Sequence, residues 1–165
     1  MKSIPESLWK AENEEKPNKL SNLNDTSHII FRFINGPESV FDFHDLPIWG
    51  EWKDVLLPIM KQAAKSLGYK NYRFPRAMLA RLPAGGEISG HSDGGANHHI
   101  HKIHVPLITN SETIFHVGSQ ARHLPVGEIF EVNNKRFHAV RNDGELDSIH
   151  FIFECYNMDD YGKLG

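Results

Sequence analysis

Short apolar segments separated by Gly, Pro and Asn constrain the fold of this chain more than any other feature. Beyond residue 75 these segments are rich in β-branched and aromatic residues. They cover residues 76–82, 100–108, 113–117, 128–132, 137–141 and 149–156. Many short strands with turn residues between them are typical of antiparallel barrels and sandwiches. The sequence therefore predicts a mainly β fold.

Two further elements are expected ahead of these strands. Residues 28–34 are β-branched and aromatic and end at the turn signal Asn35-Gly36-Pro37, which predicts a strand. From residue 49 to 67 apolar residues return at helical spacing, and Gly68 stands where a helix C-cap belongs. One amphipathic helix is predicted there, with Pro58 expected to kink or split it.

The length of the chain limits the number of domains. A chain of 165 residues is long enough for one domain with a real core and too short for two large ones. Residues 1–27 are rich in charged residues and Asn, and their apolar residues are too scattered to form a stripe. We therefore expect a loosely ordered N-terminal arm over residues 1–27 and a single β-barrel domain over residues 28–165.

Charge and cysteine content narrow the classes of function. The net charge of -3 provides no global basic field, so we expect no nucleic-acid partner. No apolar run has the length of a signal peptide or a membrane span, which favours a cytoplasmic protein without a membrane partner. The single cysteine, Cys155, excludes an internal disulfide and lies in an apolar run, so we expect an inert, partly buried thiol. The oligomeric state is not readable from the sequence.

Histidine is concentrated in one part of the sequence. Eight of the 11 histidines lie between His91 and His138, in less than a third of the chain. Most single histidines in this region are interpreted as ordinary hydrogen-bonded residues, and His98, His99 and His101 as solvated loop residues rather than lining of a substrate entrance. The excess as a whole still requires an explanation.

One triplet in this region suggests metal binding. In His91-Ser92-Asp93 an imidazole and a carboxylate stand two residues apart, and on an extended chain both project to the same side and reach one ion. Residues 82–90 form a turn-rich approach to this triplet. Two histidines and one carboxylate mark non-haem iron(II) oxygenases, because they leave three positions of the metal open. His138 is the strongest candidate for the distal ligand.

With these residues in place, the sequence resembles the aspartyl/asparaginyl β-hydroxylase family of iron(II)- and 2-oxoglutarate-dependent oxygenases. The resemblance covers roughly residues 78–153. In chain order, its parts are residues 82–90, residues 91–93, the run Lys102-Ile103-His104-Val105-Pro106-Leu107-Ile108-Thr109-Asn110, Phe115-His116-Val117-Gly118, Gly127-Glu128 and His138-Ala139-Val140-Arg141-Asn142. Their order and spacing make them jointly specific.

The resemblance implies both a fold and an activity. The fold would be a double-stranded β-helix, a jelly-roll or cupin-like barrel with the N-terminal helix packed on it. In it, His91, Asp93 and His138 would hold the catalytic Fe(II), with 2-oxoglutarate and dioxygen as co-substrates and succinate and CO2 as co-products. The expected substrate is an amino acid, or an Asp, Asn or Pro side chain in a peptide.

One position departs from the family pattern. The family usually places an arginine ten residues beyond the distal histidine, where it clamps the far carboxylate of 2-oxoglutarate, and this chain has Ser148 there. A buried carboxylate needs a compensating cation or several donors, so a substitute is expected. We interpret Lys102 as the charge partner and His104 as a second donor. The co-substrate candidates are Lys102, His104, Ser148 and His150, with Arg81 and Arg141 in reserve.

Two other functions remain open at this level. A cupin-like barrel that binds a metal or a small acid without oxygen chemistry also fits, because His138-x-x-x-Asn142 is compatible with a cupin metal motif and the arginine is missing at Ser148. Zinc-dependent hydrolysis is a weaker alternative, since zinc accepts the same ligands and keeps one open site.

Overall fold

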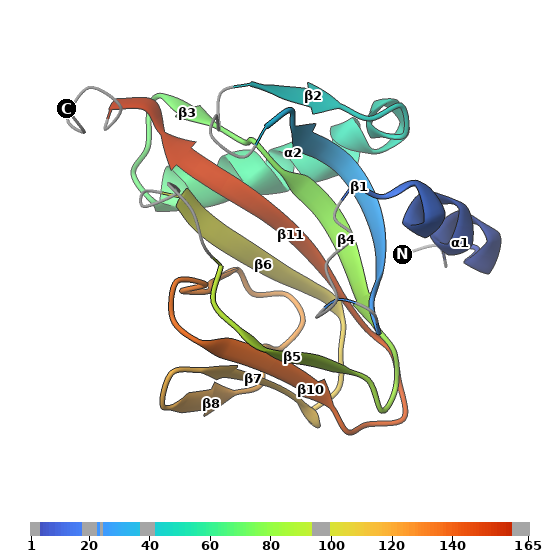
Figure 1. Cartoon of the computed structure of the whole chain (residues 1–165). Coiled ribbons are helices and arrows are strands. Elements are labelled where there is room, and N and C mark those ends of the chain that lie inside the picture. The colour runs from blue at the N-terminus through green and yellow to red at the C-terminus, as the bar shows by residue number, and fades with distance from the viewer. Residues whose placement is uncertain (1–3, 18–22, 24, 37–41, 94–99, 160–165) are drawn as a thin grey trace.

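The structure is a computed structural model that describes residues 4–17, 23, 25–36, 42–93 and 100–159 (Figure 1). Its helices are α1 (Glu6–Glu15) and α2 (Trp49–Ser66). Its strands are β1 (Ser27–Ile34), β2 (Phe43–Asp45), β3 (Tyr72–Arg73), β4 (Ala77–Leu82), β5 (Glu87–His91), β6 (Ile100–Ile108), β7 (Thr113–Val117), β8 (Gln120–Arg122), β9 (Phe130–Glu131), β10 (His138–Asn142) and β11 (Ser148–Asn157). In this described part of the chain, neither helix is long and apolar enough to cross a membrane.

The strands form two antiparallel sheets. The larger sheet has the order β2-β1-β4-β11-β6-β9, with β3 also paired to β11, and the smaller sheet has the order β5-β10-β7-β8. Side chains of both sheets line one cavity, and Figure 1 shows α2 lying across the other face of the larger sheet. This is the double-stranded β-helix with a packed helix that the sequence analysis expected.

Strand β11 shows how the larger sheet separates the core from the cavity. Successive side chains of a strand point to opposite faces. Phe151, Phe153 and Cys155 are fully buried in the core cluster together with residues of α2. The alternate residues, among them Ser148 and His150, line the cavity. Burial raises the pKa of the Cys155 thiol to about 12, which agrees with the inert thiol expected from the sequence.

Helix α2 confirms the helix predicted over residues 49–67. It continues through Pro58 as one helix and is not split into two. Gly68 follows it with a φ of 77°, in the left-handed region that favours glycine. The amide of Gly68 donates to the carbonyl of Lys65 and that of Tyr69 to the carbonyl of Ala64, both at 3.0 Å. These two bonds form the Schellman motif that ends many helices.

The N-terminal residues differ from the expected loose order. Residues 6–15 form α1, and Trp9 is only 2% exposed. The guanidinium carbon of Arg81 lies 4.8 Å from the centre of a Trp9 ring, and its nitrogens bind the Glu6 carboxylate. One buried tryptophan therefore anchors a helix that has no continuous apolar stripe. The division of the chain at residues 27 and 28 stays a prediction.

The predicted strands agree with the structure except at β5 and where strands are very short. Five expected segments correspond to β1, β4, β6, β7 and β11, and residues 137–141 overlap β10. In the segment 128–132 only two residues pair, as β9. Strand β5 was not expected, because residues 82–90 were interpreted as a turn-rich approach, and it has five residues. Strands β2, β3 and β8 were not expected either, and each has three residues or fewer. Such strands depend on their pairing partners rather than on a pattern of their own.

Candidate metal centre

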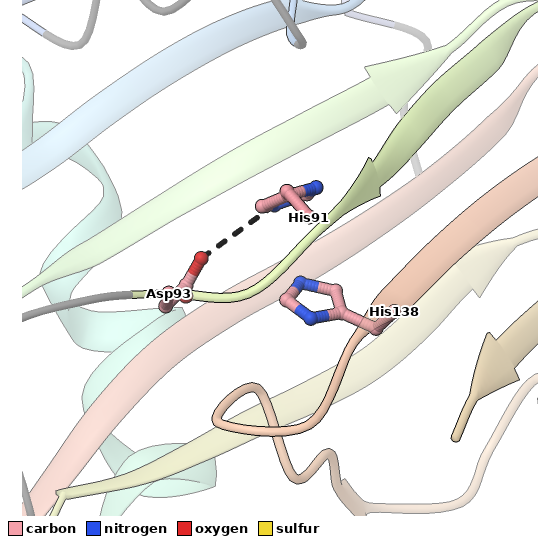
Figure 2. Close-up of side chains that lie close together, drawn as sticks. All are labelled: His91, Asp93 and His138. Atoms are coloured by element: carbon pink, nitrogen blue, oxygen red, sulfur yellow. Dashed lines mark ion pairs between the residues drawn. The ribbon is translucent and has the colours of Figure 1, made fainter.

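The three predicted ligands come together at the ends of two paired strands. His91 is the last residue of β5, Asp93 follows two residues later, and His138 is the first residue of β10. The antiparallel register places His138 directly opposite His91, with ring centres 4.2 Å apart (Figure 2). The potential ligand atoms of all three side chains lie within 4.8 Å of one another.

Backbone carbonyls orient the two imidazoles in the same way. Nδ1 of His91 lies 2.8 Å from the carbonyl oxygen of Ser89, and Nδ1 of His138 lies 3.0 Å from that of Arg136. Because a carbonyl only accepts, each Nδ1 carries the proton and donates it. Each Nε2 then carries a lone pair for a metal. Histidines that bind metals usually donate the other ring N–H to a carbonyl or carboxylate in this way.

The carboxylate of Asp93 is held through one of its two oxygens. Oδ2 accepts hydrogen bonds from Nζ of Lys102 at 2.6 Å and from Nδ2 of Asn134 at 2.7 Å. The other oxygen, Oδ1, lies 3.5 Å from Nε2 of His91. The two donors therefore leave Oδ1 as the oxygen directed toward the histidines.

The charge states of the site suit metal binding. Burial opposes ionisation of Asp93, but the charge of Lys102 and the hydrogen bonds from Asn134 and Lys102 outweigh it and hold the pKa of Asp93 below its ordinary value. Burial lowers the pKa of His138, which favours the neutral ring. An ionised carboxylate and a neutral imidazole are the forms that bind a metal.

Asn134 is a site residue that the sequence analysis missed. Besides its side-chain bond to Asp93, its carbonyl accepts the Asp93 amide at 2.9 Å. It lies between β9 and β10 in a segment with two consecutive asparagines, Asn133 and Asn134, which reads as an ordinary turn. No local pattern distinguishes the asparagine that reaches the aspartate.

A cavity of about 810 Å³ opens beside the three side chains, and it also contains the residues expected to bind a co-substrate. Lys102, His104, Ser148 and His150 all line it. Lys102 uses its ammonium on Asp93, and Ser148 Oγ lies 3.3 Å from Thr109 Oγ1. The site therefore places the expected charge partner, Lys102, in contact with a predicted metal ligand.

His104 and His150 form a buried pair on adjacent strands. Their Nδ1 atoms are 3.4 Å apart. The ring of Phe115 stacks on His150 with centres 5.2 Å apart and meets the ring of His104 edge-on at 5.5 Å. Burial is the main cause that lowers the pKa of His150 to about 4 and that of His104 well below its ordinary value.

The remaining sequence candidates lie elsewhere or are already paired. Arg81 lines the cavity but binds Glu6, and Arg141 is exposed and binds Asp143. His98 and His99 lie outside the described residues. His101, interpreted as a solvated loop residue, instead lies in β6, where its ring contacts the hydroxyl of Tyr69 and Nδ1 lies 2.5 Å from Oε1 of Glu131.

The fold and the site together define a class of protein: a double-stranded β-helix with two histidines and one aspartate gathered beside an internal cavity. A match to the aspartyl/asparaginyl β-hydroxylase family covers residues 51–157, which is more than half of the chain. The chain belongs to this family, and the resemblance stated from its motifs is confirmed. No curated protein sequence matches the chain.

One solved structure supports the fold, and two others are similar over part of the chain at lower TM-scores. A 2OG-Fe(II) oxygenase family oxidoreductase from Burkholderia pseudomallei superposes with a TM-score of 0.59 at 12% identity, over 89% of this chain and 75% of the other. A predicted oxalate decarboxylase from Thermotoga maritima gives a TM-score of 0.42 at 18% identity, over 58% and 73%. The cupin domain of Cnp3 from Schizosaccharomyces pombe gives 0.43 at 13%, over 56% and 62%.

Proposed function

We propose that this protein is an iron(II)- and 2-oxoglutarate-dependent dioxygenase that hydroxylates an amino acid, or an Asp, Asn or Pro side chain in a peptide. The observation that carries this proposal is the convergence of His91, Asp93 and His138 beside the cavity. Membership of the aspartyl/asparaginyl β-hydroxylase family supports it. When bound, iron with 2-oxoglutarate and dioxygen supplies the oxidising chemistry, with succinate and CO2 as co-products.

The donor set fits iron(II). Two neutral imidazole nitrogens and one carboxylate oxygen occupy three positions and leave the others for a co-substrate and dioxygen. Nε2 of His91, Nε2 of His138 and Oδ1 of Asp93 are the atoms that would bind, because each partner atom on the same side chain is already engaged by the protein. Lys102 and Asn134 are positioning residues in this scheme, since they hold the carboxylate through Oδ2.

The cavity has the size and lining that a small substrate requires. Its volume of about 810 Å³ lies within the range of small-molecule sites, roughly 300 to 1,000 Å³. Apolar side chains such as Met78 and Ile152 line part of it and would exclude water from the reacting atoms. The protein's part is to bind and orient the substrate carbon beside the metal.

An ion pair in the cavity wall favours a substrate that carries charges of both signs. Nη1 of Arg76 donates to both carboxylate oxygens of Glu154 at 2.8 Å, and both residues line the cavity. A guanidinium and a carboxylate side by side match the carboxylate and the ammonium of a free amino acid. We therefore favour a free amino acid over a protein side chain as the substrate.

The proposal is tested by spectroscopy of the protein with its co-substrate. Iron(II) and 2-oxoglutarate added under anaerobic conditions should give a weak visible charge-transfer band. The band should disappear in His91→Ala and persist in His116→Ala, which removes an exposed histidine of β7 in the same sheet. A missing band in the unaltered protein, or an unchanged band in His91→Ala, would contradict the proposal.

The substrate is found by mass spectrometry of amino acids and peptides incubated with the loaded protein. A product heavier by one oxygen atom, formed together with succinate and with oxygen uptake, is the expected result. Substrates that are hydroxylated only as free amino acids would support the role given to Arg76 and Glu154.

A cupin-like barrel that binds a metal or a small acid without oxygen chemistry is the second candidate. It is favoured by Ser148, which stands where the family usually has a carboxylate-binding arginine, and whose hydroxyl lies by Thr109. Succinate release coupled to oxygen uptake would eliminate this alternative. Zinc found in protein purified without chelators, together with no iron-dependent band, would instead favour hydrolysis.

A further inference from the structure

The buried histidine pair has a nitrogen without a partner. Among the side chains that the structure describes, Nε2 of His150 is the buried polar atom with no hydrogen-bond partner. His150 is 4% exposed and His104 is 7% exposed, and both line the cavity. Buried polar atoms are nearly always hydrogen bonded, so an unpaired one in a cavity wall points to a ligand.

The contact within the pair determines where its protons are. Two neutral imidazoles share an Nδ1 to Nδ1 bond only if one ring carries a proton on Nδ1 and the other carries its proton on Nε2. The neutral pair therefore offers one N–H donor and one lone pair at its two Nε2 atoms. Adding one proton keeps the bond between the rings and turns both Nε2 atoms into donors. The pair then carries one positive charge.

In the described part of the chain, every lysine and arginine that lines the cavity already has an interaction partner. Arg76 is paired with Glu154 in the part of the cavity assigned above to the amino-acid substrate, Arg81 is paired with Glu6, and Lys102 is paired with Asp93. Lys135 is exposed and has an interaction of its own. At Ser148, two residues before His150 on the same face of β11, the protein supplies only a hydroxyl. A second carboxylate of a bound acid thus meets no free permanent charge here.

Burial, and to a lesser extent the neighbouring charges, keep the pair neutral while the cavity lacks an anion. The groups that act on it are Lys102 on β6 and His138 on β10, which disfavour a charge on His104, and His123, which disfavours a charge on His150. Of the residues that β4 contributes to the cavity, only Arg81 carries a charge, and it is paired with Glu6. Glu154, farther along β11, is already paired with Arg76. A carboxylate beside the pair would reverse this balance because it favours the protonated form.

We propose that His104 and His150 form a site that binds the far carboxylate of 2-oxoglutarate. The pair takes up one proton when this carboxylate binds, and its positive charge replaces the permanent cation that is missing at Ser148. This inference rests on the proposed function. It makes co-substrate binding dependent on pH in a direction that an arginine would not produce. Because one proton is taken up per ligand, the Kd rises with pH, by up to about tenfold per pH unit.

Isothermal titration calorimetry tests the proton uptake directly. The full chain, loaded with iron(II) under anaerobic conditions, is titrated with 2-oxoglutarate at one pH in two buffers of different ionisation enthalpy. The expected uptake is close to one proton per ligand. Pyruvate is the matched probe, because it has the same carboxylate and keto group for the metal but no far carboxylate. Its uptake should be close to zero.

Variants locate the proton. The double variant His104→Gln with His150→Gln keeps polar side chains that cannot become charged, and it should remove the uptake and flatten the pH dependence of the Kd. His116→Gln, at an exposed position on β7, should leave both unchanged. Nitrogen-15 NMR of the imidazoles in the unaltered protein should show protonation of the pair on adding 2-oxoglutarate, which provides a readout if a variant fails to fold.

The outcomes separate this inference from the proposed function. A charge-transfer band with 2-oxoglutarate but no proton uptake, or equal uptake with pyruvate, would overturn the histidine site and leave the oxygenase standing. Uptake that survives in the double glutamine variant would also overturn it. If the unaltered protein gives neither a band nor binding at any pH, the proposed function and this inference fail together.

Discussion

Replacing Asn134 by alanine should weaken metal binding without changing the charge of the site. The change removes the Nδ2 donor that lies 2.7 Å from Oδ2 of Asp93. The backbone carbonyl of residue 134, which accepts the Asp93 amide at 2.9 Å, stays in place. Lys102 still holds the same oxygen, so the carboxylate loses one of two constraints rather than both.

The expected magnitude follows from the bond that is lost. A hydrogen bond to a charged group contributes about 1.5 to 3 kcal/mol. The Asp93 side chain is 30% exposed and keeps its second donor, which places the loss near the lower value. About 1.5 kcal/mol corresponds to a metal Kd about tenfold weaker, at the lower end of the about 10- to 100-fold typical of residues that orient metal ligands.

The assay is competition for iron(II) between the protein and a chromophoric chelator under anaerobic conditions. Asn133→Ala is the matched control, because the neighbouring asparagine is exposed and makes no side-chain bond to Asp93 among the bonds that the structure gives. A change of less than twofold in Asn134→Ala, or an equal loss in Asn133→Ala, would refute the reasoning about Oδ2.

Three further predictions concern the ligand, the N-terminal helix and acid stability. His138→Ala should weaken iron binding by more than about 100-fold, which is the upper limit for residues that only orient metal ligands. The same competition assay measures it, and His116→Ala should bind iron as the unaltered protein does. Trp9→Ala should lower the free energy of unfolding by about 3 to 5 kcal/mol in urea titrations, against little change in Lys10→Ala. Burial lowers the pKa of His28 to about 3, so the unfolded chain binds more protons between about pH 3 and 6.5. Stability should therefore rise with pH in that window, by up to about 1.4 kcal/mol per unit from this residue, and His28→Gln should flatten the slope.

Each of these has a clear contrary result. Iron binding by His138→Ala within tenfold of the unaltered protein would mean that the ring is not a ligand. Equal stability of Trp9→Ala and Lys10→Ala would mean that α1 contributes nothing to the fold. An unchanged acid slope in His28→Gln would assign the slope to other buried groups.

The features that could be predicted from the sequence are those encoded in local patterns. Helix α2 was predicted because its apolar spacing and Gly68 are local signals, and the capping bonds bear this out. The three candidate ligands were found because two of them share a motif and the third lies in a segment that resembles a family. The structure brings all three together.

The features that were missed depend on contacts between distant residues. Trp9 is a single aromatic residue without a periodic pattern, and only its packing reveals that α1 forms. Asn134 and Lys102 meet Asp93 because the chain from β9 to β10 and strand β6 pass the same point, which no sequence spacing states. The contact of His104 with His150 likewise results from pairing of β6 with β11.

The place of β5 at the edge of the smaller sheet gives the two opposed histidines a mechanical consequence. β5 pairs only with β10 in the order of that sheet, and His91 is the last residue of the strand. An ion bound by both imidazoles would hold the C-terminal end of this edge strand against β10. A shift of the register by one residue would turn one ring to the opposite face and remove it from the ion. A bound ion would therefore also stabilise the register of the two strands.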